Sequence, residues 1–276
     1  MIAQPIAARA LQRAPRLHLP DLSHHALNVW RRDRDVYLKL WRTELILPII
    51  EPLLVLLGMG LGLGHFISLG NHESYVAYLA PGVLAQFGMF QACFECCWGA
   101  YFRMENQGVY TAIAATPASM DDIVIGELLW GATRSLINST YMLAVCLALT
   151  PSFGIIHSPS ALLALPLAYL LGFCFGALSL SFTAMAPAIS FLGYFFNLVI
   201  IPLFWLSGGF FPLEQLPGPL QTMAWATPLA PAVSTYRHLF NGSPQFADLA
   251  HVALIAGEGA LFTFAAITLV RRRLIK

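Results

Sequence analysis

The sequence predicts an all-α polytopic membrane protein with six transmembrane helices, an N-terminal interfacial amphipathic helix, and re-entrant extracellular helices between spans 5 and 6. Its 276 residues are 58% hydrophobic and only 11% charged, whereas soluble domains have about 25% charged residues. Between Arg134 and Glu214 lie 79 consecutive residues without a formal charge, far more than the roughly 20 that cross a bilayer. These apolar runs are continuous and not alternating, which favours helices over a membrane barrel.

The residues before the first predicted span divide into two parts. Residues 1–23 are expected to form a cytoplasmic extension, and the first 44 residues lack the apolar core of a cleavable signal peptide. Residues 24–44 mix basic and aromatic side chains, and Trp30, Tyr37 and Trp41 recur at helical spacing. We therefore expect an interfacial helix whose aromatic side chains face the lipid. A basic juxtamembrane linker with only a topological role is the alternative.

Six apolar segments reach the length of a membrane-spanning helix. They cover about residues 45–69, 75–100, 123–149, 161–184, 190–212 and 250–270 of a transmembrane domain at residues 45–276. Prolines mark the turns, with Pro151 and Pro159 after the third segment and Pro187 after the fourth. The sequence thus predicts a bundle of six spans.

The basic residues predict the orientation of these spans. Of the 15 Lys and Arg residues, eight precede the first span and four follow the last. Because basic residues concentrate on the cytoplasmic side, both termini are expected in the cytoplasm, which requires an even number of spans. The loop at residues 102–122 then faces the cytoplasm, and Arg237 is the basic residue expected on the outer side.

Residues 213–249 are too irregular for a span and too apolar for a simple loop. They contain five prolines and two apolar stretches of less than spanning length. Segments of this kind are typical of re-entrant or interfacial helices. We therefore expect two short helices that enter the membrane from its outer side.

The sequence lacks the motifs of catalysis, ATP binding and metal binding. Neither Lys39 nor Lys276 follows the glycine of a P-loop. His72 and Glu73 begin a zinc-protease pattern, but Val76 occupies the place of the second histidine, and no GxSxG elbow occurs. The five cysteines have no histidine cluster beside them. We expect no catalytic residue, metal site or cofactor in this chain, and its net charge of +1 gives no sign of a nucleic-acid partner.

Five ionisable residues lie inside the predicted spans, where charge is costly and marks function. They are Glu51, Glu95, Glu127, Arg134 and Glu258. Arg134 stands near the middle of its span. One interpretation is an ion pair of Arg134 with Glu258 or Glu127 that holds helices in register. The other is a polar lining for a passage that meets a substrate headgroup.

Two parts of the sequence resemble the ABC-2 membrane subunits of bacterial exporters. The first comprises residues 102–113 (FRMENQGVYTAI) with 115–118 (ATPA) and 122–130 (DIVIGELLW). The second comprises residues 206–217 (LSGGFFPLEQLP) with 228–231 (PLAP) and Arg237. Within this family the sequence resembles the permeases of lipo-oligosaccharide exporters.

The resemblance implies a machine in the bacterial cytoplasmic (inner) membrane. It would contain two copies of this permease, as a homodimer, and two copies of a separate ABC ATPase subunit that binds ATP and Mg. The implied substrate is an amphipathic lipo-oligosaccharide, or a related glycolipid or polysaccharide, that passes outward between the permeases. The aromatic fifth span would then offer stacking surfaces for sugar rings or acyl chains, with simple packing as the alternative.

The resemblance also implies roles for particular residues. Residues 102–122 correspond to the family's coupling helix, which sits in a groove of the ATPase. The residues expected at this contact are Arg103, Met104, Glu105, Tyr110 and Ile113. Residues 213–235 correspond to the family's extracellular re-entrant helices, and the functional residues expected at their start are Phe211, Pro212, Glu214 and Pro217.

Other functions remain open at this stage. An ABC-2 drug exporter would share these motifs. A proton-coupled secondary transporter would use Glu258 and Arg134 as its relay, but such proteins often carry inverted repeats, and the sequence shows no convincing repeat. An intramembrane enzyme is the third alternative, and the missing motifs weaken it.

Overall fold

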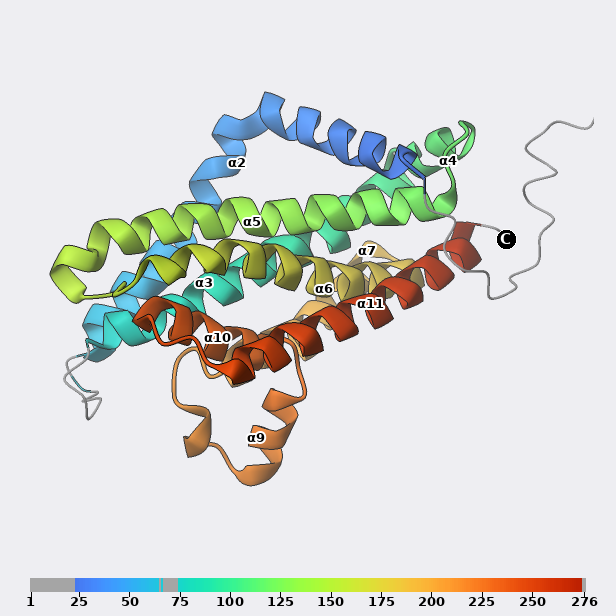
Figure 1. Cartoon of the computed structure of the whole chain (residues 1–276). Helices are drawn as coiled ribbons and strands as arrows, with labels where there is room; N and C mark the ends of the chain where they lie inside the picture. The colour runs from blue at the N-terminus through green and yellow to red at the C-terminus, as the bar shows by residue number, and fades with distance from the viewer. Residues whose placement is uncertain (1–22, 65, 67–73, 275–276) are drawn as a thin grey trace, which may run out of the picture.

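The computed structural model describes residues 23–64, 66 and 74–274, and every regular element within them is a helix (Figure 1). The predicted all-helical, multi-pass membrane protein is thereby confirmed. The predicted extension at residues 1–23 lies, except for Ser23, outside the described residues. The elements are α2 (His25–Gly64), α3 (Tyr75–Phe94), η1 (Glu95–Gly99), η2 (Phe102–Asn106), α4 (Val109–Ala114), α5 (Met120–Phe153), η3 (Pro159–Leu163), α6 (Ala164–Met185), α7 (Ile189–Phe195), η4 (Phe196–Ile200), α8 (Ile201–Leu206), η5 (Leu213–Gln215), α9 (Gly218–Trp225), α10 (Leu229–Asn241) and α11 (Phe246–Leu274).

Five helical stretches within the described residues are long and apolar enough to cross a membrane. They are Tyr75–Asn106, Met120–Phe153, Pro159–Met185, Ile189–Leu206 and Phe246–Leu274, which correspond to the second to sixth predicted spans. The apolar helix Ile50–Gly64 corresponds to part of the first predicted span and is shorter than a usual span. The rest of that predicted span, apart from Phe66, lies outside the described residues.

Helix α2 contains both the predicted interfacial helix and the beginning of the predicted first span. It is one helix of 40 residues, and Figure 1 shows that it bends sharply along its course. The sequence supplies a cause, because Pro48 and Pro52 both fall inside this helix. A proline removes a backbone donor and crowds the preceding turn, which kinks a helix.

The aromatic side of α2 packs partly against the protein. Trp30 Nε1 donates a hydrogen bond to Thr133 Oγ1 at 2.9 Å, and the Tyr37 ring meets the Trp130 ring edge-on at 5.6 Å. The expectation that these two aromatic side chains face lipid was wrong, because α5 offers them a hydrogen-bond acceptor and a ring. Trp41 is exposed.

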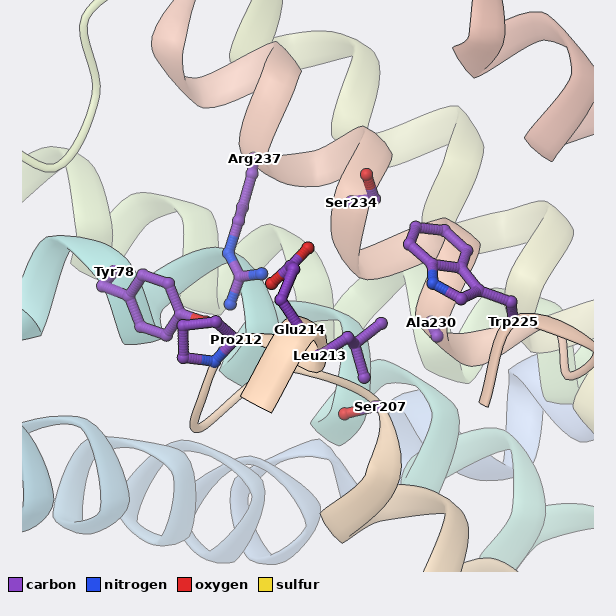
Figure 2. A pocket seen from close by; sticks show the side chains of 9 residues that line it. All are labelled: Tyr78, Ser207, Pro212, Leu213, Glu214, Trp225, Ala230, Ser234 and Arg237. Carbon is purple, nitrogen blue, oxygen red and sulfur yellow. The ribbon is translucent and has the colours of Figure 1, made fainter. Parts of the chain in front are cut away.

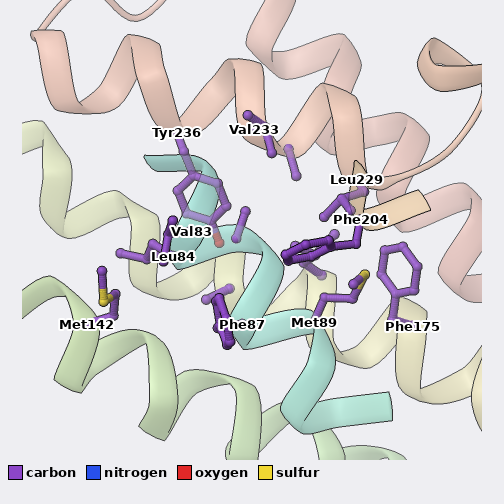
Figure 3. Close-up of a cluster of buried hydrophobic side chains, with 14 of the residues drawn as sticks. Val83, Leu84, Phe87, Met89, Met142, Phe175, Phe204, Leu229, Val233 and Tyr236 are labelled. Carbon is purple, nitrogen blue, oxygen red and sulfur yellow. The ribbon is translucent and has the colours of Figure 1, made fainter. Parts of the chain in front are cut away.

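Helix α3 lies at the centre of the core and is buried along most of its length. Figure 3 shows Phe87 and Met89 of α3 among side chains from four other helices. The Phe87 and Phe204 rings meet edge-on at 6.2 Å, and Tyr236 of α10 and Phe175 of α6 are fully buried beside them. The second predicted span is therefore the element against which the others pack.

One end of the bundle gathers charged residues from segments far apart in the sequence. The Ser23 backbone N–H donates to Asp122 Oδ1 at 2.8 Å, which joins the residue before α2 to the start of α5. Arg271, near the end of α11, forms a two-pronged ion pair with the Asp121 carboxylate. The beginnings of α2 and α5 and the end of α11 therefore meet at one end, as Figure 1 shows.

The backbones of α3 and the segment after α8 approach closely at two glycines. A Cβ atom added at Gly82 would lie 2.6 Å from the Gly209 Cα atom. Because that neighbour is backbone, it has little freedom to move aside. Small residues at helix contacts permit such approaches in membranes, where packing drives association.

Gly82→Ala is expected to destabilise the protein by about 1–3 kcal/mol, the usual cost of overpacking. The matched control is Gly62→Ala, because a Cβ atom at Gly62 meets nothing within 4 Å. The measurement is the free energy of unfolding of the detergent-solubilised protein. Equal effects of the two substitutions would show that the Gly82 contact has no energetic weight.

Candidate functional site

Five charged side chains lie together beside the predicted coupling segment, and we call them the ion network: Asp33, Glu95, Arg103, Glu127 and Arg134. Arg103 Nη1 donates to Glu95 Oε1 at 2.7 Å, and Arg103 Nε donates to Glu127 Oε1 at 2.9 Å. The remaining Arg103 nitrogen pairs with the second oxygen of Glu127. Arg134 Nε lies 3.5 Å from Glu95 Oε2. One arginine thus joins carboxylates from two different helical stretches.

The ion network is largely removed from solvent. The Glu127 side chain is fully buried, and those of Arg103 and Arg134 are 13% and 11% exposed. A buried charge is costly unless it is paired and hydrogen-bonded, and a bidentate arginine–carboxylate pair is the strongest arrangement for this. Removing one partner therefore affects the whole group.

Local helix geometry positions the two ends of this arginine bridge. Glu95 begins η1 and Arg103 lies in η2, and both segments are π-helical. Wider π turns interrupt α-helices most often at functional sites. Between them stands Gly99, where an added Cβ atom would lie 2.6 Å from Glu95 Oε1 and 3.2 Å from Arg103 Nη1. The glycine thus leaves room for the ion pair, and a larger residue there would displace the Glu95 carboxylate.

Asp33 brings the first part of α2 into the ion network. Its side chain is buried and accepts a hydrogen bond from Arg32 Nε at 3.1 Å. Burial and the nearby Glu127 carboxylate together raise the pKa of Asp33 to about 6, against the opposing effects of Arg103 and Arg32. The charge on α2 therefore depends on α5 and on the coupling segment.

Aromatic contacts cover the ion network on the α2 side. The Arg134 guanidinium lies over the Tyr37 ring, 4.6 Å from its centroid. Tyr37 in turn contacts Trp130, one helical turn before Arg134 on α5. Cation–π contacts are stronger when they are shielded from water. The first part of α2 is thus held to α5 by rings as well as by charge.

The structure brings together three of the five ionisable residues predicted inside spans, namely Glu95, Glu127 and Arg134. The structure gives Arg134 an acidic neighbour that the sequence did not suggest, because it lies by Glu95, while Arg103 pairs with both Glu127 oxygens. Glu258 lies half-buried on α11, and its Oε2 atom has no hydrogen-bond partner among the described residues.

The sequence did not assign Arg103 or Asp33 to the ion network, and it grouped Glu51 with residues that the structure places elsewhere. Glu51 is exposed on α2, unlike the buried residues of the ion network. Arg103 was assigned only to the partner contact and Asp33 to no site. The spacing was a signal for Arg103, which follows Glu95 by eight residues, about two helical turns, whereas Asp33 had no such signal.

The expected coupling residues divide between the interior and the surface. Met104 and Tyr110 are buried in a small cluster with Ile123, and Ile113 packs at its edge. Glu105 is partly exposed and pairs with Arg273 of α11 at 2.8 Å. Between residues 106 and 117 the exposed side chains are Asn106, Gln107, Thr111, Ala112, Ala115, Thr116 and Pro117.

The C-terminal end of α11 holds this loop against the bundle through contacts of Arg273. Besides its pair with Glu105, Arg273 Nη1 donates to the Thr183 carbonyl at 2.8 Å and to the Ala186 carbonyl at 2.7 Å. Cations at the last carbonyls of a helix satisfy groups that lack intrahelical partners. Arg273 therefore ties the coupling segment to the end of α6.

At the opposite side of the fold, a fixed turn follows α8. Gln86 Nε2 donates to the Ser207 Oγ atom at 2.7 Å, and Arg237 Nη2 donates to the Gly208 carbonyl at 2.5 Å. Gly208 has φ +75°, which glycine adopts most readily. The Arg237 guanidinium also lies 4.0 Å from the centroid of the Tyr78 ring. The basic residue expected outside thus organises the entry to the predicted re-entrant segment.

The four residues expected at that segment occupy different environments. Phe211 packs against the main core. Pro212 and Glu214 line a small cavity with Arg237. Pro217 is exposed and precedes α9. The structure brings Pro212 and Glu214 together and leaves the other two outside the cavity.

Arg103→Met is expected to cost about 3–5 kcal/mol of unfolding free energy, because it leaves two buried carboxylates without their shared cation. Adding Glu127→Leu should recover much of this loss. The control is Arg34→Met, whose ion pair with Asp35 is exposed and worth about 0–1 kcal/mol. Denaturant unfolding in detergent measures all three, and equal losses in both single variants would contradict the assignment.

The stability of the protein is expected to fall as the pH rises from about 4 to about 6. Folding raises the pKa of Asp33 from 3.8 to about 6, so the folded state keeps this proton where the unfolded chain has released it. The stabilisation is full below the unfolded pKa and is lost as the pH passes the folded pKa. Asp33→Asn should flatten the unfolding curve in this window, whereas Asp35→Asn, at an exposed position, should not. An unchanged slope in Asp33→Asn would refute the assignment.

Comparison with known proteins places this architecture in a family. Residues 27–241 match the profile of the ABC-2 type transporter. The chain is 34% identical over 258 residues to nodulation protein J of Rhizobium leguminosarum bv. trifolii, covering 94% of this chain and 97% of that protein. It is 34% identical over 257 residues to nodulation protein J of Rhizobium meliloti (strain 1021), covering 93% and 97%. It is 23% identical over 237 residues to the inner membrane transport permease YadH of Escherichia coli (strain K12), covering 86% and 88%.

These matches confirm the resemblance seen in the sequence. The matched range begins in the first part of α2 and ends at the last residue of α10. It therefore includes the ion network, the coupling segment and the turn after α8. From this range and the helical membrane architecture, we conclude that the chain belongs to the ABC-2 type transporter family and is a membrane permease.

Proposed function

We propose that this chain is the membrane-spanning permease subunit of an ATP-driven exporter that moves an amphipathic lipo-oligosaccharide, or a related glycolipid or polysaccharide, outward from the cytoplasm. The observation that carries the proposal is the ion network, which ties an exposed loop to three membrane-associated helices in a chain of this family. ATP and Mg would bind to a separate ATPase subunit.

The proposed topology has six spans and both termini in the cytoplasm of a bacterium, with the protein in the inner membrane. The second part of α2 would form the first span. Ser23 contacts Asp122, and Arg271 pairs with Asp121, both at one end of the bundle. These contacts support a common side of the membrane for the start of α2, the coupling loop and the end of α11. Most of the basic residues lie at these segments, as the positive-inside rule requires.

Coupling would begin at the exposed surface of residues 106–117. We propose that two ATPase subunits, one for each permease, contact this surface, which mixes polar and small apolar side chains. The Arg103 bridge would transmit the movement, because it joins η2 to Glu95 before it and to Glu127 on α5. Met104 and Tyr110 would hold the loop from within, and Ile113 and Glu105 would lie at its edge.

The substrate path would lie at the seam of a permease homodimer. Several large apolar side chains on α2 and on the α7–α8 stretch are exposed in the single chain, including Leu54, Leu61, Tyr194 and Trp205. Phe94 is also exposed, and its ring lies 4.5 Å from the buried Phe196 ring. Such rings would pack against an acyl chain or a sugar face. The proposed re-entrant helices α9 and α10 would border the outer exit.

A proton-coupled secondary transporter is the second candidate, and Glu258 is the observation that favours it. One of its carboxylate oxygens is buried on α11 without a hydrogen-bond partner among the described residues. A carboxylate inside a membrane span is a common proton carrier. An ABC-2 drug exporter differs from the proposed function only in its substrate, so competition between a glycolipid and a hydrophobic drug would distinguish the two.

The test is transport in vesicles that contain the permease and the ATPase subunit that co-purifies with it. Outward movement of glycolipid is expected only with ATP, and a Walker-motif variant of the ATPase should abolish it. Ala112→Arg, on the exposed coupling surface, should lower substrate-stimulated ATP hydrolysis about tenfold, as expected from a contact worth 1.4 kcal/mol.

Ala226→Arg is the matched control, because Ala226 is also exposed but lies just after α9. Its ATP hydrolysis should equal that of the unmodified protein. Transport by the permease alone, driven by a proton gradient and lost in Glu258→Gln, would replace the proposed function with the second candidate.

A further inference from the structure

A small cavity lies between the start of the proposed re-entrant segment, helix α10 and helix α3. Its volume is about 140 Å³. Figure 2 shows Tyr78 on one side and Trp225 on the other, with Glu214, Ser234 and Arg237 between them. Pockets for drug-sized ligands measure about 300–1,000 Å³. This cavity therefore has room for one small ring and not for a whole amphiphile.

The lining residues are held in place before any ligand arrives. Arg237 is fixed by the Gly208 carbonyl and by the face of the Tyr78 ring. Ser207 accepts a hydrogen bond from Gln86 and donates one to the Phe204 carbonyl. Preorganised groups lose little entropy on binding, which raises affinity for a small ligand.

The aromatic walls are also oriented. The Trp225 ring stacks on the His251 ring with centroids 5.6 Å apart, which supports it from α11. Tyr78 stacks with Tyr75 at 6.1 Å and donates its hydroxyl hydrogen to the Gly208 carbonyl at 3.4 Å. Two supported rings thus stand at separate sides of a cavity that also contains charged and hydroxyl groups.

The lining chemistry selects among small ligands. An acyl chain would desolvate Glu214 and Arg237 without replacing their hydrogen bonds, which is costly. A phosphate would meet the Glu214 carboxylate, which points toward Arg237 across the cavity (Figure 2). A pyranose ring has an apolar C–H face for the Trp225 ring and a rim of hydroxyl groups that both donate and accept. Glu214, Ser234 and Arg237 supply the complementary acceptors and donors.

We propose that this cavity is a saccharide subsite that binds one pyranose unit on the outer side of the membrane. Its place on the export route rests on the proposed function, but its binding chemistry does not. A sugar held here after it leaves the seam would oppose return of the substrate, because the site lies at the start of the segment that borders the exit.

The test uses the full chain in lipid nanodiscs and measures binding of methyl β-D-glucopyranoside by saturation-transfer NMR. Saturable binding is expected for this ring, and none for sorbitol, an acyclic polyol without a ring face. Trp225→Leu and Glu214→Ala should each weaken binding about tenfold or more. Trp41→Leu should leave it unchanged, because Trp41 is exposed on the first part of α2, outside the cavity. Unchanged thermal unfolding of each variant excludes loss of fold.

Absence of saturable binding, equal binding of sorbitol, or equal affinity in Trp225→Leu and Trp41→Leu would overturn the subsite. ATP-driven transport measured in parallel keeps the two proposals separate. Transport without pocket-dependent sugar binding would overturn only the subsite. Pocket-dependent sugar binding without ATP-driven transport would support the subsite and overturn the proposed exporter.

Discussion

The contacts of Arg103 with Glu95 and Glu127 set the conditions for much of this fold. Charges in a low-dielectric interior stay only where each is paired and hydrogen-bonded, so the helical stretch from α3 to η2 and helix α5 must keep a fixed spacing. Gly99 leaves space for the pair, the Arg134 guanidinium extends it, and the Tyr37 ring covers it. The loop that follows Arg103 therefore cannot move independently of the spans.

The two sides of the molecule use charge differently. On the side of the coupling loop, arginines meet carboxylates and free helix carbonyls, and the pairs bring distant parts of the chain together. On the side of the turn after α8, Arg237 contacts a carbonyl and an aromatic face instead. Ion pairs thus stabilise the side of the coupling loop. On the side of the turn after α8, Arg237 and aromatic side chains surround a cavity.

Most of the architecture could be predicted from the sequence because the membrane imposes it. Long uncharged runs must become helices, and the second to sixth predicted spans lie where hydropathy placed them. The expected turn at Pro151 was wrong, because α5 continues through this proline to Phe153. The side of α2 that faces protein could not be predicted, because helical spacing of Trp30 and Tyr37 is the same whether the rings meet lipid or α5.

Three of the charged residues in the ion network could be predicted from the sequence, but the ion pairs that they form could not. Charged side chains are rare inside membrane spans because their burial costs free energy, so Glu95, Glu127 and Arg134 could be identified from the sequence. The partner of each depends on π-helical turns in η1 and η2, which rotate the residues after them and leave no pattern in hydropathy. For the same reason Arg103 was assigned only to the loop, and Asp33, which lies in a basic segment, was assigned to no site.

The position of Arg271 and Arg273 near the end of α11 has a consequence for biogenesis. Their partners Asp121 and Glu105 lie some 150 or more residues earlier in the chain. During synthesis those acidic residues emerge long before the arginines that pair with them. The loop they flank can take its final form only after the last helix has been inserted, so a partner that recognises that form would engage finished permeases and pass over nascent ones.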